Sequence, residues 1–163
     1  MTYIDRLLII INKFLMYLGG VFLVAMILLT SANIFMRILK LPISGTFELM
    51  GYFGAVATAF SLANTENLKG HIAVDILINA FSEKTQLFLK SLNNLILGFL
   101  FVFATNNLFI KTKTLQMSGE LTETLRIIYY PFTFMVAIGC LALTLTFFLN
   151  FIKSISQLFR SQS

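Results

Sequence analysis

The stretch FLMYLGGVFLVAMILLTSANIFM, residues 14–36, runs for 23 residues without a charged side chain. A helix rises about 1.5 Å per residue, so roughly 20 residues cross the 30 Å hydrocarbon core of a bilayer. Three more charge-free runs follow, and the shortest of them can also span if Phe47 and Glu48 lie at the interface. The sequence therefore predicts one four-helix membrane domain over residues 1–163, with spans at about 14–36, 47–65, 91–110 and 129–152.

Composition supports this class. Residues of the AVILMFWYC set make up 58% of the chain, and charged residues only 12%. Soluble domains carry about 25% charged residues, and a chain of this length cannot hide so much apolar surface in a soluble core. The runs are apolar on all sides rather than alternating, which argues against transmembrane strands. We therefore expect an all-α integral membrane protein.

The distribution of basic residues predicts the orientation. With four spans, both termini lie on one side of the membrane, and the positive-inside rule places the more basic side in the cytoplasm. The formal net charge of +5 fits phospholipid head groups better than nucleic acid, because the basic residues flank the spans instead of forming one patch. Seven lie on the side of the termini (Arg6, Lys13, Lys69, Lys84, Lys90, Lys153, Arg160) and five on the other (Arg37, Lys40, Lys111, Lys113, Arg126). Both termini are therefore predicted to be cytoplasmic.

The connector between the second and third spans carries a polar stripe. His71, Asp75, Asn79 and Ser82 recur at spacings of four, four and three, which places them on one narrow side of a helix. The residues around them are apolar. The sequence predicts an interfacial amphipathic helix at about 71–84, either a simple elbow or a helix that lies against another protein surface.

The sequence offers little support for catalysis or for a cofactor. His71 and Asp75 could touch at their helical spacing, but two ligands do not close a metal site. Cys140 is the only cysteine, which excludes an intramolecular disulfide and favours a packing role. We predict that the chain is not an enzyme and binds no cofactor or metal.

Charged residues lie at the edges of the spans and not in their middles, where transport chemistry would require them. Arg37 and Glu48 are the two edge residues of interest. They can serve as interfacial anchors, or Glu48 can pair with a basic residue, either Arg37 or one on a partner chain.

A row of small residues follows one side of the second span. Gly51, Ala55, Ala59 and Ala63 recur every four residues, and such rows let membrane helices approach closely. The row can pack within the chain's own bundle or against a partner. Together with the absence of deep charges, it indicates an accessory subunit.

These features, in this order, resemble the small membrane subunit of tripartite ATP-independent periplasmic (TRAP) transporters, the DctQ-like family. The resemblance covers roughly residues 30 to 142. Gly70 to Asp75, Gly-His-Ile-Ala-Val-Asp, is similar to the family's Gly-His-Ile-x-Val-Asp signature. The other matching residues are Asn33 and Arg37, Pro42, Gly45 to Leu49, Thr124 to Arg126, Pro131 and Gly139.

The resemblance implies a division of labour in the bacterial inner membrane. A large multi-span subunit would bind substrate and sodium, and a periplasmic binding protein would capture a carboxylate-type solute such as a C4-dicarboxylate or a sialic acid. The small subunit would act as a scaffold for the large one and help dock the binding protein. In that case the row from Gly51 to Ala63 would contact a partner helix, Arg37 and Glu48 would stabilise a span edge, and His71 and Asp75 would fix the connecting helix.

Two other hypotheses remain open. The first is a self-contained small multi-helix transporter that uses Glu48. The second is a membrane enzyme or redox protein, whose cofactor the lone His71 and Cys140 could scarcely hold.

Overall fold

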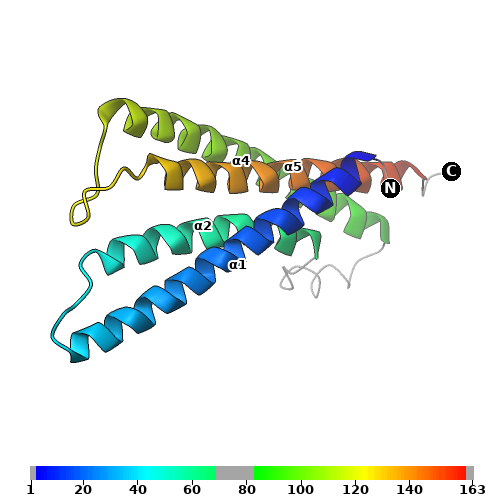
Figure 1. The fold of residues 1–163 in the computed structure, drawn as a ribbon. Helices are drawn as coiled ribbons and strands as arrows, with labels where there is room; N and C mark the ends of the chain where they lie inside the picture. The colour runs from blue at the N-terminus through cyan, green and yellow to red at the C-terminus, as the bar shows by residue number, and fades with distance from the viewer. Residues whose placement is uncertain (1–2, 69–82, 161–163) are drawn as a thin grey trace.

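The computed structural model describes residues 3–68 and 83–160, and this part of the chain forms four α-helices. They are α1 (Tyr3–Ile38), α2 (Thr46–Asn67), α4 (Glu83–Ser118) and α5 (Tyr130–Arg160) (Figure 1). No strand occurs among these residues, although Leu121 and Ile128 form an isolated bridge. The predicted all-α class is confirmed.

Three segments are long and apolar enough to cross a membrane: Asp5–Ile38, Thr85–Ser118 and Tyr130–Gln157. They correspond to the first, third and fourth predicted spans. The helix α2 is not among them, because it carries Glu48 and Glu66 near its ends and Asn64 in its last turns. The crossing of the membrane by α2 therefore stays a prediction.

The helices are longer than the charge-free runs suggested. A span was predicted from residue 14, but α1 begins at Tyr3, and α4 extends at both ends beyond the predicted 91–110. A charge-free run marks the part of a helix that suits hydrocarbon, whereas backbone hydrogen bonding continues past charged residues until a helix-ending conformation occurs. For α4 that conformation is Gly119, with a φ of 63°.

The ends of α1 and α5 follow known capping chemistry. At the end of α1 the N–H of Leu41 donates to the carbonyl of Met36 at 2.9 Å, and that of Lys40 donates to Arg37 at 3.0 Å. Lys40 has a φ of 60°, so this is a Schellman motif with lysine where glycine is usual. Pro131 is the second residue of α5, in the first turn where helices tolerate proline.

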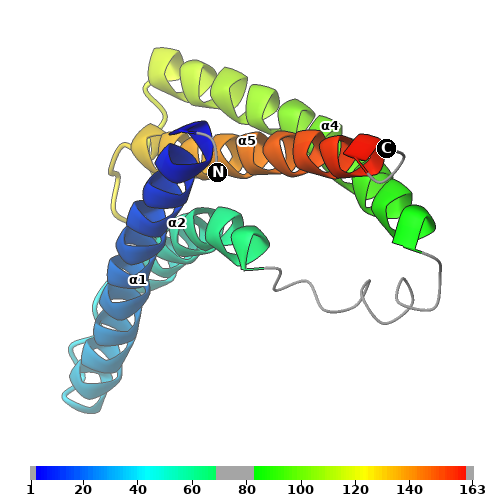
Figure 2. The same cartoon turned by 90° about the vertical axis from the view of Figure 1, so that its right-hand side faces the viewer.

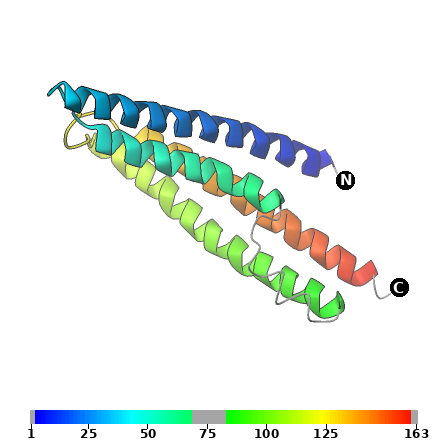
Figure 3. The same cartoon turned by 90° about the horizontal axis from the view of Figure 1, so that it is seen from below.

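The helices lie in an open row in the order α1, α2, α5, α4 (Figures 1 and 2). The hairpin of α1 and α2 packs on the hairpin of α4 and α5 through α2 and α5. The helix α1 meets α5 mainly near the chain termini, and both termini lie at the same end of the molecule (Figure 3). The helices α1 and α4 form the two edges of the row.

The helices α2 and α5 approach each other closely at Gly139 of α5. A Cβ built there would lie 2.7 Å from the backbone carbonyl carbon and oxygen of Ala59 on α2. Around this contact lies a narrow apolar core that includes Val56, Ala63 and Phe147. The outer faces of the helices expose large apolar side chains, which suits contact with phospholipid chains.

The predicted interfacial helix at 71–84 falls mostly outside the described residues, as do His71 and Asp75. Of that range, only Glu83 and Lys84 are described, as the first residues of α4.

We predict that Gly139→Ala destabilises the protein by about 1–3 kcal/mol, because the new methyl group meets backbone and forces the hairpins apart. The matched control is Gly20→Ala on α1, where a Cβ would meet nothing within 4 Å. Reversible unfolding of both variants in detergent micelles measures the difference. Equal stability of the two would contradict the close contact.

Candidate functional site

The first turn of α2, directly after the connector from α1, meets the connector between α4 and α5 through Glu48. The Glu48 carboxylate accepts the backbone N–H of Thr124 at 2.6 Å and that of Leu125 at 3.2 Å. We call residues 39–48 and 119–129 together the loop junction. It joins the two hairpins at the end of the molecule opposite the termini.

A tight turn at residues 122–127 presents these N–H groups. The N–H of Thr122 donates to the carbonyl of Ile127 at 2.9 Å, and the N–H of Ile127 donates to the Thr122 hydroxyl at 3.2 Å. Arg126 has a φ of 51°, in the left-handed region. Because the chain reverses here, the N–H groups of Thr124 and Leu125 have no hydrogen-bond partner within the turn. The Glu48 carboxylate accepts both of them.

On the other side of the loop junction, the connector between α1 and α2 is held in a defined conformation. Gly45 has a φ of 73°, and a Cβ there would overlap the Leu125 side chain. The Asn33 side-chain oxygen accepts the N–H of Ile43 at 3.0 Å, and the Thr46 hydroxyl donates to the carbonyl of Ile43 at 2.8 Å. These hydrogen bonds hold the first connector in the conformation in which it packs against the second connector.

Glu48 lies in the first turn of α2, outside the three apolar segments described above. Desolvation alone would raise the pKa of its carboxyl. The hydrogen bonds from Thr124, Leu125 and Thr122 together lower the pKa by more than desolvation raises it, so the pKa lies below the ordinary value of 4.5. At neutral pH it is a carboxylate engaged within the chain.

The end near the termini carries a second set of polar contacts between the hairpins. Lys153 Nζ lies 3.0 Å from Asp5 Oδ1, and the Asn12 amide donates to the Thr146 hydroxyl at 2.9 Å. The Asn150 amide donates to Glu66 at 3.3 Å. Because Thr146, Asn150 and Lys153 are spaced by four and three residues, they lie on one side of α5. We call these three pairs the polar seam.

The chain matches the family model described as "Tripartite ATP-independent periplasmic transporters, DctQ component" over residues 26–157. This chain belongs to the DctQ family. No curated protein and no solved structure matches it.

As a DctQ component, the chain is a small membrane subunit of a TRAP transporter in the bacterial inner membrane. Such a transporter also contains a large membrane subunit and a periplasmic binding protein. The DctQ family consists of transporter components and not of enzymes. No group of three His, Cys, Asp or Glu that could hold a metal occurs in residues 3–68 and 83–160.

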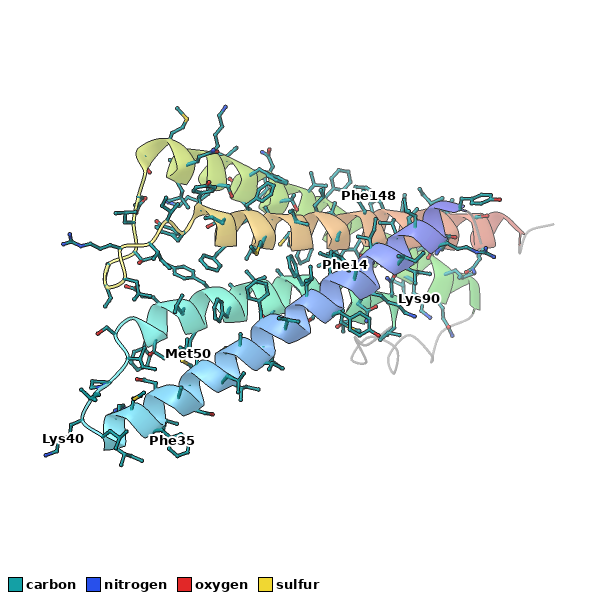
Figure 4. The ribbon with its side chains drawn as sticks, viewed as in Figure 1. Phe14, Phe35, Lys40, Met50, Lys90 and Phe148 are labelled. Carbon is teal, nitrogen blue, oxygen red and sulfur yellow. The ribbon has the colours of Figure 1, made fainter. Side chains whose placement is uncertain are left out.

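The structure separates the residues of this DctQ chain that the sequence grouped together. Ala59 and Ala63 are buried within the chain, whereas Gly51 and Ala55 are exposed. Arg37 is also exposed and makes no ion pair with Glu48, which bonds to backbone instead. Lys40, near the start of the first connector, points away from the helices (Figure 4).

Sequence reasoning missed the polar seam. Asp5 and Asn12 precede the first charge-free run and were not expected to lie in a helix. The four-and-three spacing of Thr146, Asn150 and Lys153 was visible in the sequence and places these residues on one side of a helix. It does not identify their partners, which lie on other helices.

We predict that Glu48→Gln lowers the unfolding temperature at neutral pH more than Glu123→Gln, a nearby exposed control. The lowered pKa means that the ionised carboxylate stabilises the fold above pH 4.5 and that this stabilisation is lost as the pH falls through the lowered value. The gap between wild type and Glu48→Gln should therefore narrow in acid. Thermal unfolding from pH 7 to pH 3 measures it, and a gap of constant size would contradict this role for the charge.

Proposed function

We propose that this chain is the scaffold subunit of a sodium-coupled TRAP importer for a carboxylate-type solute, such as a C4-dicarboxylate or a sialic acid. It holds the large membrane subunit in the bilayer while the transport domain of that subunit moves, and it helps dock the periplasmic binding protein. The carrying observation is that Glu48 and the polar seam join the two hairpins at both ends of the molecule. A rigid body is what a scaffold requires.

In this proposal α2 also crosses the membrane, making one four-helix domain over residues 1–163. Its 22 residues give a length of about 33 Å, and it packs along α1 and α5, which are both apolar enough to span. The termini face the cytoplasm, in keeping with the larger number of basic residues on that side. The loop junction then faces the periplasm, where it would meet the binding protein. The stretch at 71–84, with His71 and Asp75, would lie at the cytoplasmic interface.

The proposed contact with the large subunit includes the exposed half of the small-residue row. Gly51 has open space where a Cβ would be, and Ala55 lies one turn further along the same exposed side of α2. A partner helix can approach such a surface closely. Ala59 and Ala63 are buried where α2 packs against α5, and this packing holds the exposed residues of α2 in position. Arg37 is exposed in the last turn of α1, next to the loop junction, and would contribute at the rim of this contact.

The alternative is a self-contained small transporter that uses Glu48. A transported proton or ion would have to displace the two backbone N–H groups that this carboxylate accepts, which opens the loop junction at every cycle. The scaffold proposal requires no such step.

We predict that the tagged chain, purified from its native membrane in mild detergent, brings a large multi-span protein with it in roughly equal amount. Gly51→Leu should reduce that yield without changing the stability of the chain alone, whereas Gly20→Leu on α1 should leave it unchanged. Quantitative mass spectrometry of the purified material gives the ratio.

The same purified chain, reconstituted alone in liposomes, should move no solute. Solute uptake by the chain alone that disappears in Glu48→Gln would overturn the scaffold proposal in favour of the small transporter.

A further inference from the structure

The outward side of α4 carries a regular line of exposed residues at alternating spacings of three and four. Such spacing, 3.5 residues on average, describes the contact line between two helices packed as a coiled coil. Phe103, near the middle, is 73% exposed, and Ile96 and Leu100 are more than half exposed. We call this line the α4 seam: Asn93, Ile96, Leu100, Phe103, Asn107 and Ile110.

Two amide side chains of the α4 seam fall within the apolar segment Thr85–Ser118. Asn93 and Asn107 are 14 positions apart, about 21 Å along the helix, and both fall within the charge-free run at 91–110. Asn107 donates to the carbonyl of Phe103 on its own helix at 2.8 Å, which leaves its side-chain oxygen as an outward acceptor. An amide without a partner in hydrocarbon is costly.

The outward side of α1 differs. Between Lys13 and Ser31 its exposed side chains are apolar apart from the Tyr17 hydroxyl, with Val21 65% and Leu28 64% exposed. The exposed side chains of α5 between Phe134 and Ile152 are apolar as well. These surfaces suit lipid. The α4 edge of the row (Figure 2) combines an apolar contact line with amides, which suits another protein helix.

We propose that the α4 seam binds one transmembrane helix of the large membrane subunit, with Asn93 and Asn107 hydrogen-bonded to polar groups on that helix. This inference rests on the proposed scaffold function and adds a second contact surface, separate from the exposed small residues of α2. The apolar positions between the amides supply close packing, and the amides fix the register of the two helices.

The first test is the double variant Asn93→Leu, Asn107→Leu. If the amides faced lipid, replacing them with leucine would leave the assembly unchanged or favour it. Because they bond a partner helix, the yield of the large subunit should fall roughly three- to tenfold, from the usual strength of two such bonds. The matched control is Ser31→Leu on the outward side of α1, which should change nothing, and Asn→Gln at both seam positions should restore part of the yield.

The second test places a nitroxide at Leu100 in a Cys140→Ala chain and measures its accessibility to oxygen in nanodiscs. Accessibility should fall when the large subunit is present, while a label at Leu28 stays accessible. A Leu100 label that remains accessible beside a co-purified large subunit overturns the α4 seam and leaves the scaffold function standing. Failure of any large subunit to co-purify overturns both.

Discussion

The bilayer supplies no hydrogen-bond partners, so the polar groups of so apolar a chain have to be satisfied by the chain or by another protein. In this DctQ chain those groups are used to join two helical hairpins. Glu48 accepts two backbone N–H groups at one end, and the pairs Asp5–Lys153 and Asn12–Thr146 act at the other. Between them the hairpins meet through close packing of Gly139 on Ala59. Polar contacts hold the two hairpins together at both ends, and small residues determine how closely α2 and α5 approach each other.

Much of the fold could be predicted from the sequence, because helix-length runs without charge leave few alternatives. The ends of the helices could not, since hydrogen bonding continues past the last residue that suits hydrocarbon. The role of Glu48 was also out of reach, because its donors lie 76 and 77 positions away in a turn that has no periodic pattern. The small-residue row was visible, but only the position of α5 divides it into the buried Ala59 and Ala63 and the exposed Gly51 and Ala55.

The outer surfaces then divide by chemistry. The outward sides of α1 and α5 are apolar and suit lipid, whereas α2 exposes small residues and α4 exposes amides within an apolar line. The surfaces of α2 and α4 are the ones that we propose as docking surfaces for the large subunit. This arrangement agrees with the proposal that this DctQ component stays still while the large membrane subunit moves.

If the two hairpins form one rigid frame, the distance between them stays constant during transport. Spin labels at Lys40, near the start of the first connector, and at Met117, near the end of α4, report on both hairpins in a Cys140→Ala chain. In the assembled transporter, pulsed electron resonance should give one distance that is unchanged by sodium and by the solute-loaded binding protein. A distance that shifts or splits with sodium or solute would contradict a rigid scaffold.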